Sequence, residues 1–389
     1  MKIINFILFT VIYFAASIVL MGNQYRPLTT ELIYVRYALI LFSFSTIIII
    51  YFKKNGLTNI RFPSFLSIYL FIIWILFSVS IILSEVIHQS FPFQGLFFLL
   101  FVPFIYFSVM PFLTKIGGPV IHQSLFAANL FYLLISFVTT RVEYLPYSGV
   151  AANPNGFGQI AAITVISGFF ILLSLPKKRK LAKVLLISVL ILSLASVTLS
   201  YSRTSFIVVG IITLILSVHT IVVKRNFKPI LIIILVGFIG WFSPLKEMFV
   251  HGLLEKFASL MEEGNLFNGR TGTWQAVVKE SSLFGNGQDY FEGFIEGAHN
   301  SLINILGVNG IIPALLLTTF LILVILSAFL HYIQNKKDTL AIFPFIIIVT
   351  FTLFSMTEAM FGLVGNGITI AFYHVVGSLL FKQDLKTDS

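Results

Sequence analysis

The chain has 389 residues, of which 58% are hydrophobic and 10% are charged, and its formal net charge is +10. Soluble domains carry roughly 25% charged residues, so this composition excludes a water-soluble globular protein. In a soluble protein such a charge would suggest nucleic-acid binding. Here most of the basic residues lie in loops between apolar segments, and we expect no nucleic-acid partner. The absence of cysteine excludes disulfides, thiolate zinc sites and iron–sulfur clusters.

Long apolar stretches recur from one end of the chain to the other. A hydrocarbon core of about 30 Å requires about 20 apolar residues per helix. The sequence therefore predicts twelve membrane-spanning helices, at 3–21, 32–52, 64–84, 92–112, 120–140, 156–175, 181–199, 203–223, 228–244, 301–331, 339–357 and 364–381. The expected fold is an all-α polytopic integral membrane protein with a single domain over residues 1–389. Ala15-Ala16-Ser17 in the first stretch resembles the cleavage region of a signal peptide, but the length of the stretch and its single Lys2 favour an uncleaved anchor.

The basic residues predict the orientation. Cytoplasmic loops of membrane proteins are enriched in Lys and Arg. Most of the 25 Lys and Arg residues fall in cytoplasmic segments if both termini are inside, whereas only Asp338, Asp384 and Asp388 of the acidic residues do. We therefore predict a multi-pass protein of the bacterial cytoplasmic membrane with both termini cytoplasmic.

Residues 245–300 form the one long extramembrane segment, an extracytoplasmic loop between the ninth and tenth predicted helices. Apolar residues recur in it at helical spacing, at Leu245, Phe249, Leu253, Phe257 and Leu260. Such a stripe is typical of a helix lying on the outer leaflet. It is equally typical of a helix packed on its neighbours as a lid.

Three polar fragments interrupt the apolar pattern: Ser200-Tyr201-Ser202-Arg203-Thr204, Gly269-Arg270-Thr271 and Ala298-His299-Asn300-Ser301. Counting helices puts all three on the non-cytoplasmic side. The even-numbered helices begin on that side, and a helix N-terminus is a natural site for an anion. The expected N-caps are Ser202 for the helix at 203–223, Asn300 or Ser301 for 301–331, and Asn155 for 156–175.

Two arginines belong to these fragments. Arg203 stands at a helix mouth beside Leu199 and Phe206, where a charge is costly unless it has a partner or reaches water. Its planar fork suits bidentate phosphate binding, and the plain alternative is a snorkelling anchor. Arg270 alone would be a solvated loop residue, and its interest comes from the segment that leads on to Trp274 and His299.

His299 is the candidate base, because an imidazole can accept a proton at ordinary pH. A lone histidine is more often a packing residue. His299 differs because it precedes a cap residue at an outward helix end. Gly307, Gly310 and Pro313 follow, so we expect a kink near the start of that helix.

Together these fragments resemble the O-antigen polymerases and O-antigen ligases of bacteria, polytopic enzymes that act on undecaprenyl-diphosphate-linked glycans. The resemblance covers about residues 150–315. It is carried by Asn153-Pro154-Asn155-Gly156-Phe157-Gly158, Ser202-Arg203-Thr204, Arg270 with Trp274, Phe284-Gly285-Asn286-Gly287, and His299-Asn300 with Gly307 and Gly310. It implies a GT-C-like helical fold and metal-independent glycosyl transfer, with Arg203 and Arg270 as the essential arginines and His299 as the important histidine.

The chemistry can also be argued from the residues. A sugar on a lipid diphosphate already carries a good leaving group, so neither nucleotide nor other cofactor is expected. Arg203 and Arg270 would stabilise charge on the departing diphosphate, and His299 would orient or deprotonate the acceptor hydroxyl. The expected substrate-binding residues are Asn153, Asn155, Gln159, Tyr201, Ser202, Trp274 and Asn300.

The acidic residues argue against a metal-dependent enzyme. The chain has only four aspartates and no Asp-x-Asp pair, and no His, Asp and Glu group has metal-ligand spacing. Glu262, Glu263, Glu292 and Glu296 could act as a base, although a solvated loop explains them as well.

The resulting prediction is a polysaccharide polymerase that joins lipid-linked repeat units of a capsule, exopolysaccharide or O-antigen on the outer face of the membrane. A ligase that delivers the glycan to a lipid, protein or wall polymer is the alternative. A transporter or flippase is disfavoured, because it would have related halves and binding groups near the bilayer midplane. A non-catalytic assembly protein is disfavoured because it would not need these polar fragments. The expected partners are the lipid-linked donor and acceptor, membrane lipid, and a chain-length regulator or flippase.

Overall fold

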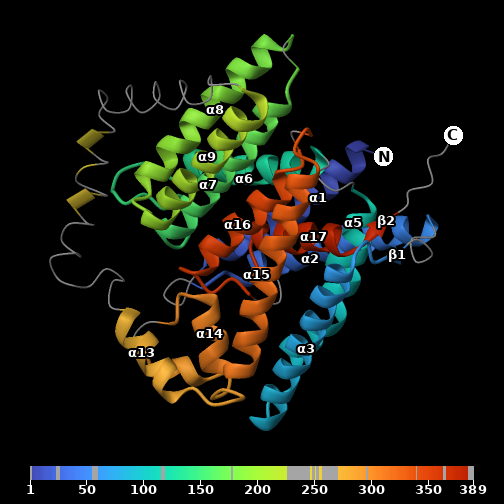
Figure 1. Cartoon of the computed structure of the whole chain (residues 1–389). Helices are drawn as coiled ribbons and strands as arrows, with labels where there is room; N and C mark the ends of the chain where they lie inside the picture. The colour runs from blue at the N-terminus through green and yellow to red at the C-terminus, as the bar shows by residue number, and fades with distance from the viewer. Residues whose placement is uncertain are drawn as a thin grey trace. The chain divides into compact units, whose positions relative to one another are not determined.

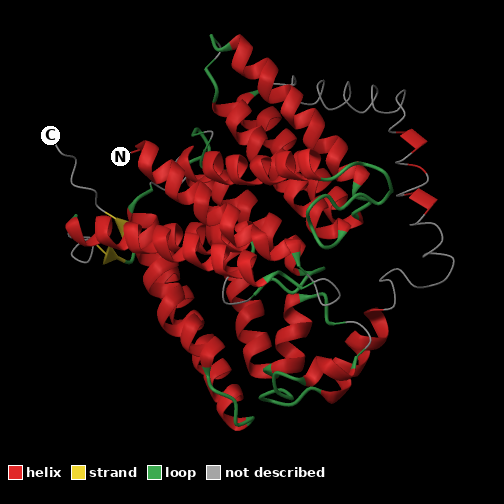
Figure 2. Ribbon diagram, turned by 180° about the vertical axis from the view of Figure 1, so that it is seen from behind, coloured by secondary structure: helices red, strands yellow, loops and turns green. Residues whose placement is uncertain are grey.

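The computed structural model is almost entirely helical. It describes residues 2–22, 27–54, 60–114, 119–176, 178–225, 246–247, 250, 254–255, 270–294, 297–338, 340–361 and 365–383. Within these ranges nine helices are long and apolar enough to cross a membrane, and two shorter apolar helices follow near the C-terminus. Figure 2 shows the helices with their connecting loops and one pair of short strands. The predicted all-helical, multi-pass membrane protein is confirmed at this level.

The helices fall into two compact units. The first unit spans residues 1–40, 119–266 and 335–343, and the second spans 41–118, 267–334 and 344–389. The described helices of the first unit are α1 (Lys2–Ser17), η1 (Ile18–Met21), α6 (Pro119–Thr139), α7 (Pro154–Ser174), α8 (Lys180–Leu199) and α9 (Arg203–Lys224). The division between the units falls within α2 (Thr30–Lys53).

The second unit holds the remaining elements. These are α3 (Phe65–Ile87), α4 (Phe93–Leu96), the π-helix η3 (Phe97–Val109), α5 (Met110–Phe112), α13 (Arg270–Glu280), η5 (Tyr290–Gly293), α14 (Ser301–Val308), α15 (Ile311–Gln334), α16 (Phe343–Ser355), α17 (Gly367–Leu380) and the antiparallel pair β1 (Ile60–Arg61) and β2 (Lys382–Gln383). Phe343, the first residue of α16, is assigned to the first unit.

The predicted spans agree with these helices, with four exceptions. The span predicted at 228–244 and the five residues of the apolar stripe between 245 and 260 lie outside the described residues. The spans predicted at 339–357 and 364–381 are shorter than expected, since α16 ends at Ser355 and α17 begins at Gly367. The single helix predicted at 301–331 is wrong, because the chain breaks there into α14 and α15.

In the first unit α7 is the central helix. It packs against α6, α8 and α9, while α1 packs against α6 (Figure 1). Of its membrane-length window 78% is buried, compared with 33% for α8. Small residues allow this close packing: a Cβ added to Gly168 would lie 2.6 Å from Leu190 of α8.

The second unit is built around a buried aromatic cluster. Trp74 of α3 is fully buried and donates a hydrogen bond from Nε1 to the carbonyl of Phe98, 2.8 Å away. Its ring contacts those of Phe320 on α15 and Tyr373 on α17. Gly377 lets α17 approach η3, because a Cβ there would lie 2.4 Å from the Cα of Phe107. One tryptophan thus joins three helices and the π-helix of this unit.

The break between α14 and α15 occurs at Gly310, whose φ is +102°. A side chain would be strained there, and an added Cβ would lie 2.2 Å from the backbone nitrogen of Gly285. The expected kink near Gly307 and Gly310 is therefore a complete interruption. The reason is that the segment 282–287 occupies the gap between the two helices.

Backbone groups released by this break bond to the inserted segment. The carbonyls of Gly307 and Val308 accept hydrogen bonds from the N–H groups of Asn286 and Gly287, both at 3.0 Å. The first N–H groups of α15 donate in turn to the carbonyls of Ser282 (3.0 Å) and Leu283 (3.2 Å). An interrupted helix is tolerated at membrane depth only when such groups are satisfied.

Candidate functional site

The N-termini of α7 and α9 meet in the first unit. Gly158, the fifth residue of α7, makes the approach possible: an added Cβ would lie 2.5 Å from Ser200 Oγ and 2.6 Å from Ser202 Cβ. Each helix N-terminus carries roughly half a positive charge. Two of them side by side favour an anion more strongly than one does.

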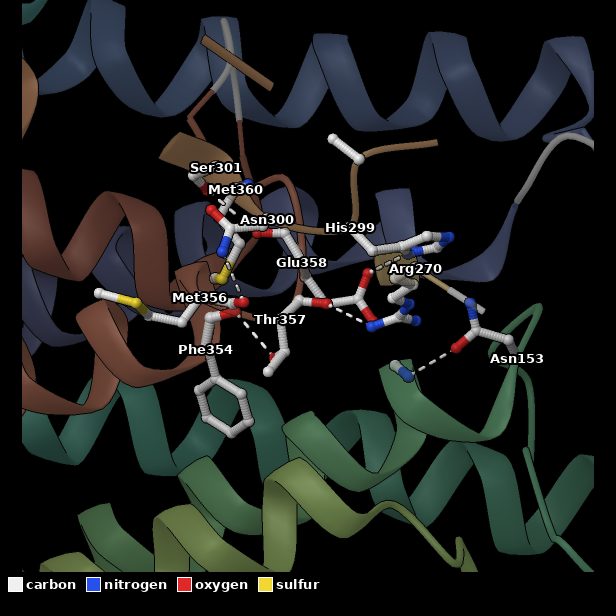
Figure 3. A network of polar contacts seen from close by, with 12 residues as sticks. Asn153, Arg270, His299, Asn300, Ser301, Phe354, Met356, Thr357, Glu358 and Met360 are labelled. Carbon is white, nitrogen blue, oxygen red and sulfur yellow. Dashed lines mark hydrogen bonds and ion pairs between the residues drawn. The ribbon is translucent and has the colours of Figure 1, made fainter. Parts of the chain in front are cut away.

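Both N-termini are capped by side chains. Ser202 Oγ accepts a hydrogen bond from the N–H of Ser205 at 3.4 Å, which confirms the predicted cap of α9. For α7 the prediction of Asn155 is wrong, because Asn153 Oδ1 accepts from the N–H of Gly156 at 2.8 Å (Figure 3). The physical reason is Pro154, which prefers the first helical position and so makes the preceding residue the cap. Asn155 is exposed within the first turn.

The other predicted residues of this unit lie near the N-termini of the same two helices. Arg203 is the first residue of α9 and is half-buried. Tyr201, just before the cap, has a φ of +51°, a left-handed conformation that is uncommon outside glycine. Gln159 is buried, with 4% of its surface exposed. We call Asn153, Tyr201, Ser202 and Arg203 the α7–α9 cluster.

A second cluster lies in the second unit, around the turn that follows α16. Arg270, the first residue of α13, donates from Nη1 to the carbonyl of Thr357 at 3.2 Å. His299 Nδ1 lies 3.2 Å from Glu358 Oε2. Figure 3 shows Arg270 and His299 on either side of the Glu358 carboxylate. We call residues 356–360 the anchoring turn.

Two further side chains bind the same turn. Asn300 Nδ2 donates to the carbonyl of Met356 at 3.0 Å. Ser301 Oγ donates to the carbonyl of Glu358 at 3.0 Å and accepts from the N–H of Met360 at 2.8 Å. Both are buried, at 8% and 1% exposure. The anchoring turn is therefore fixed by buried hydrogen bonds.

Asn300 also caps α14, as one of the two predicted residues. Its Oδ1 accepts from the N–H groups of Leu302 at 2.9 Å and Ile303 at 3.1 Å. The residue before it, His299, has a φ of +43°. Thus His299 and Tyr201 both occupy left-handed backbone immediately before an N-cap. Conformations of this kind cost about 1–3 kcal/mol and are found preferentially at functional sites.

Exposure differs sharply within the second cluster. The side chains of His299 and Glu358 are 37% and 33% exposed, whereas Asn300 and Ser301 beside them are buried. The groups able to take part in proton transfer are thus open to a ligand, and the groups that hold them in place are not. Trp274 of α13 supports the same region, because its Nε1 donates to the carbonyl of Ala298 at 2.8 Å.

The segment Phe284-Gly285-Asn286-Gly287 has structural contacts throughout. Besides bonding to the helix break, the carbonyl of Phe284 accepts from Ser84 Oγ at 2.7 Å, and that of Gly285 lies 3.1 Å from His88 Nε2. Near its end Tyr290 donates to Glu280 Oε2 at 2.8 Å. Desolvation, together with this carboxylate, raises the pKa of Tyr290 to about 12. The glycines in this segment therefore help to position α14.

Glu358 was missed by the sequence reasoning. Of the four acids considered as a base, Glu292 is exposed on η5, and Glu262, Glu263 and Glu296 lie outside the described residues. Glu358 follows an apolar helix on the side of the membrane where topology counting places His299. That position is the only signal the sequence offered.

The structure brings the predicted residues together in two groups, one per unit. Asn153, Asn155, Gln159, Tyr201, Ser202 and Arg203 belong to the first group, and Arg270, Trp274, His299 and Asn300 belong to the second. That the two groups form one site stays a prediction. In the described part of the chain no set of three or more His, Cys, Asp or Glu residues could hold a metal ion.

Comparison with known protein families found no family model that matches the chain, and comparison with curated proteins found no significant match. The resemblance drawn from the polar fragments accordingly stays a prediction.

Proposed function

We propose that this multi-pass membrane protein is a metal-independent glycosyltransferase that uses a lipid-diphosphate-linked glycan as donor. Its reaction joins that glycan to a second lipid-linked repeat unit on the outer face of the cytoplasmic membrane, so the enzyme is a polysaccharide polymerase. The observation that supports this most directly is the attachment of Arg270 and His299 to the same anchoring turn. A cation and a proton acceptor held together are what a transfer from a diphosphate requires.

The leaving group determines the role of the arginines. As the bond between the anomeric carbon and the diphosphate breaks, negative charge accumulates on the phosphate oxygens. Preorganised cations and helix N-termini stabilise that charge best, since they need no reorganisation during the reaction. Arg270 supplies such a cation in one unit. In the other, the α7–α9 cluster supplies Arg203 and two adjacent helix N-termini.

The positions of the polar groups disfavour a transporter. Carriers place their binding groups near the bilayer midplane, on broken helices in related halves. Here Asn153, Ser202 and Asn300 are N-caps, and Arg203 and Arg270 are first residues of helices. The polar groups therefore lie at helix ends, and in the proposed topology these ends face the outer leaflet, where a lipid headgroup would lie.

The test is a reconstituted transfer reaction. Purified protein in liposomes is given a defined undecaprenyl-diphosphate oligosaccharide, and the products are separated by size. A ladder of repeat units supports a polymerase, a single conjugate to another acceptor supports the ligase alternative, and unchanged donor on the opposite leaflet supports a transporter. His299→Gln is compared with His331→Gln in the last turn of α15, which serves as the matched control. Full ladder formation by His299→Gln would contradict the proposed site.

A further inference from the structure

We infer that Glu358 is a positioning residue that holds the His299 imidazole as the tautomer protonated at Nδ1, leaving Nε2 to accept a proton from the incoming hydroxyl. The part of this inference that concerns the hydroxyl rests on the proposed function. The tautomer itself follows from the contact between the two side chains when the Glu358 carboxylate is ionised.

The contact between the two side chains fixes the direction of the hydrogen bond. Nδ1 of His299 lies 3.2 Å from Oε2 of Glu358, within hydrogen-bonding distance. An ionised carboxylate only accepts hydrogen bonds. A neutral imidazole in this contact must therefore donate from Nδ1. The lone pair then resides on Nε2, the nitrogen on the other side of the ring.

The backbone on both sides of this contact is immobilised. On the Glu358 side, its N–H donates to the carbonyl of Phe354 at 3.0 Å, and its carbonyl accepts from Ser301 Oγ at 3.0 Å. On the His299 side, the next residue is Asn300, which caps α14 and also bonds to Met356. The side chains of His299 and Glu358 are consequently held opposite each other, because the segments that carry them are connected by these hydrogen bonds.

Stability does not explain the pair. Both side chains are about one-third exposed, and ion pairs at such positions contribute little to folding because water screens them. Ser301 and Asn300 already attach the anchoring turn to α14 without help from the carboxylate. The His299–Glu358 contact is thus available for a role other than holding the fold.

The path of the proton during transfer shows which role Glu358 would have. The acceptor oxygen forms a bond to the anomeric carbon while its proton moves to His299 Nε2. The bond between that carbon and the diphosphate oxygen breaks, and its electron pair departs with the lipid diphosphate. His299 then carries a positive charge, which the carboxylate of Glu358 stabilises at 3.2 Å. The proton later passes to water.

The first measurement is independent of enzyme activity. Full-length protein labelled with ¹⁵N at histidine is examined by NMR, and the signals of His299 are identified by their loss in His299→Gln. We expect a protonated Nδ1 and an unprotonated Nε2 in the unaltered protein. Glu358→Ala should shift the population toward the Nε2-protonated tautomer. Glu292→Ala, on the exposed η5, is the matched control and should leave the spectrum unchanged.

The second measurement is kinetic. Glu358→Gln should lower kcat for glycan transfer on the order of 10²-fold, the range expected when proton transfer is impaired. KM for the lipid-linked donor should stay within about twofold, and Glu358→Asp should recover part of kcat. Elution of each variant as a single species on size exclusion shows that the fold is retained.

The outcomes separate the two proposals. If the tautomer and kcat are both unaffected by Glu358→Ala and Glu358→Gln, the positioning role is overturned even where His299→Gln abolishes transfer. If the tautomer follows Glu358 but no donor is consumed by the unaltered protein, the proposed function fails and the positioning of His299 stands. A rise in KM for the donor with unchanged kcat would also overturn the inference, because Glu358 would then be a residue that binds the donor.

Discussion

Gly158 lies against Ser202, so the N-terminal part of α7 and the cap of α9 share one tightly packed contact. An added Cβ would lie 2.6 Å from the Cβ of Ser202 and 2.5 Å from Ser200 Oγ. Neither partner can move far, because Ser202 Oγ is bonded to Ser205 Oγ at 2.8 Å and Ser200 Oγ to the carbonyl of Val197 at 2.7 Å. The geometry of the α7–α9 cluster therefore depends on residue 158 being a glycine.

Gly158→Val should lower the free energy of unfolding by about 1–3 kcal/mol, because it overpacks this contact. The measurement is the thermal unfolding midpoint in detergent. Gly210→Ala provides the control within α9, since an added Cβ there meets nothing within 4 Å. Equal midpoints for the two variants would show that the two N-termini are not in contact.

Gly310→Ala tests the helix break. A residue with a side chain at φ +102° is strained by about 1–3 kcal/mol, and the Cβ would in addition displace the backbone of Gly285. Unfolding should therefore begin at a lower temperature than in Gly272→Ala, where the space around an added Cβ is open. Hydrogen exchange at the amides of Asn286 and Gly287, which bond across the break, should become faster. Unchanged exchange would argue that the segment is held in another way.

Arg203→Ala and Arg270→Ala should each reduce glycan transfer by at least about 10²-fold, because each removes a cation expected to stabilise the departing diphosphate. Cells carrying either variant should lack long-chain polysaccharide while the amount of the protein in the membrane stays normal. Arg141→Ala, at an exposed loop position, is the matched control and should give chains of ordinary length. Normal chain lengths in the Arg203 or Arg270 variant would remove that residue from the site.

Excess EDTA should leave the rate of transfer by the purified enzyme unchanged. The reason is that arginines and helix N-termini take the place of a divalent cation in the proposed chemistry. The rate is measured before chelation, after chelation and after adding back Mg²⁺ or Mn²⁺. Loss of activity that a divalent cation restores would contradict the proposed mechanism.

The membrane-spanning helices could be read from the sequence because lipid leaves the backbone little choice. An apolar stretch of about 20 residues must satisfy its own hydrogen bonds, and a helix does so within the segment. The same argument does not predict where a helix is interrupted when the backbone groups at the break bond to a segment that is distant in the sequence. Gly307 and Gly310 suggested a kink, but only the structure shows the segment from Ser282 to Gly287 filling it.

Local rules recovered part of the candidate site. Ser202 and Asn300 were found as caps because a cap bonds to backbone two or three residues away. The expectation of Asn155 as the cap is wrong because Pro154 takes the first helical position, which makes Asn153 the cap. Glu358 stands 59 residues from His299, and no local pattern specifies a pair at that separation. Contacts of this kind depend on how helices pack, which a single sequence does not state.

The anchoring turn has a consequence for biogenesis. A polytopic chain enters the bilayer from its N-terminus, so α13 and α14 leave the ribosome well before residues 356–360 do. Until those residues arrive, Arg270 and Asn300 have no carbonyl from this turn to bind and His299 has no Glu358. The second cluster therefore assembles only after α16 and the turn that follows it have been synthesised.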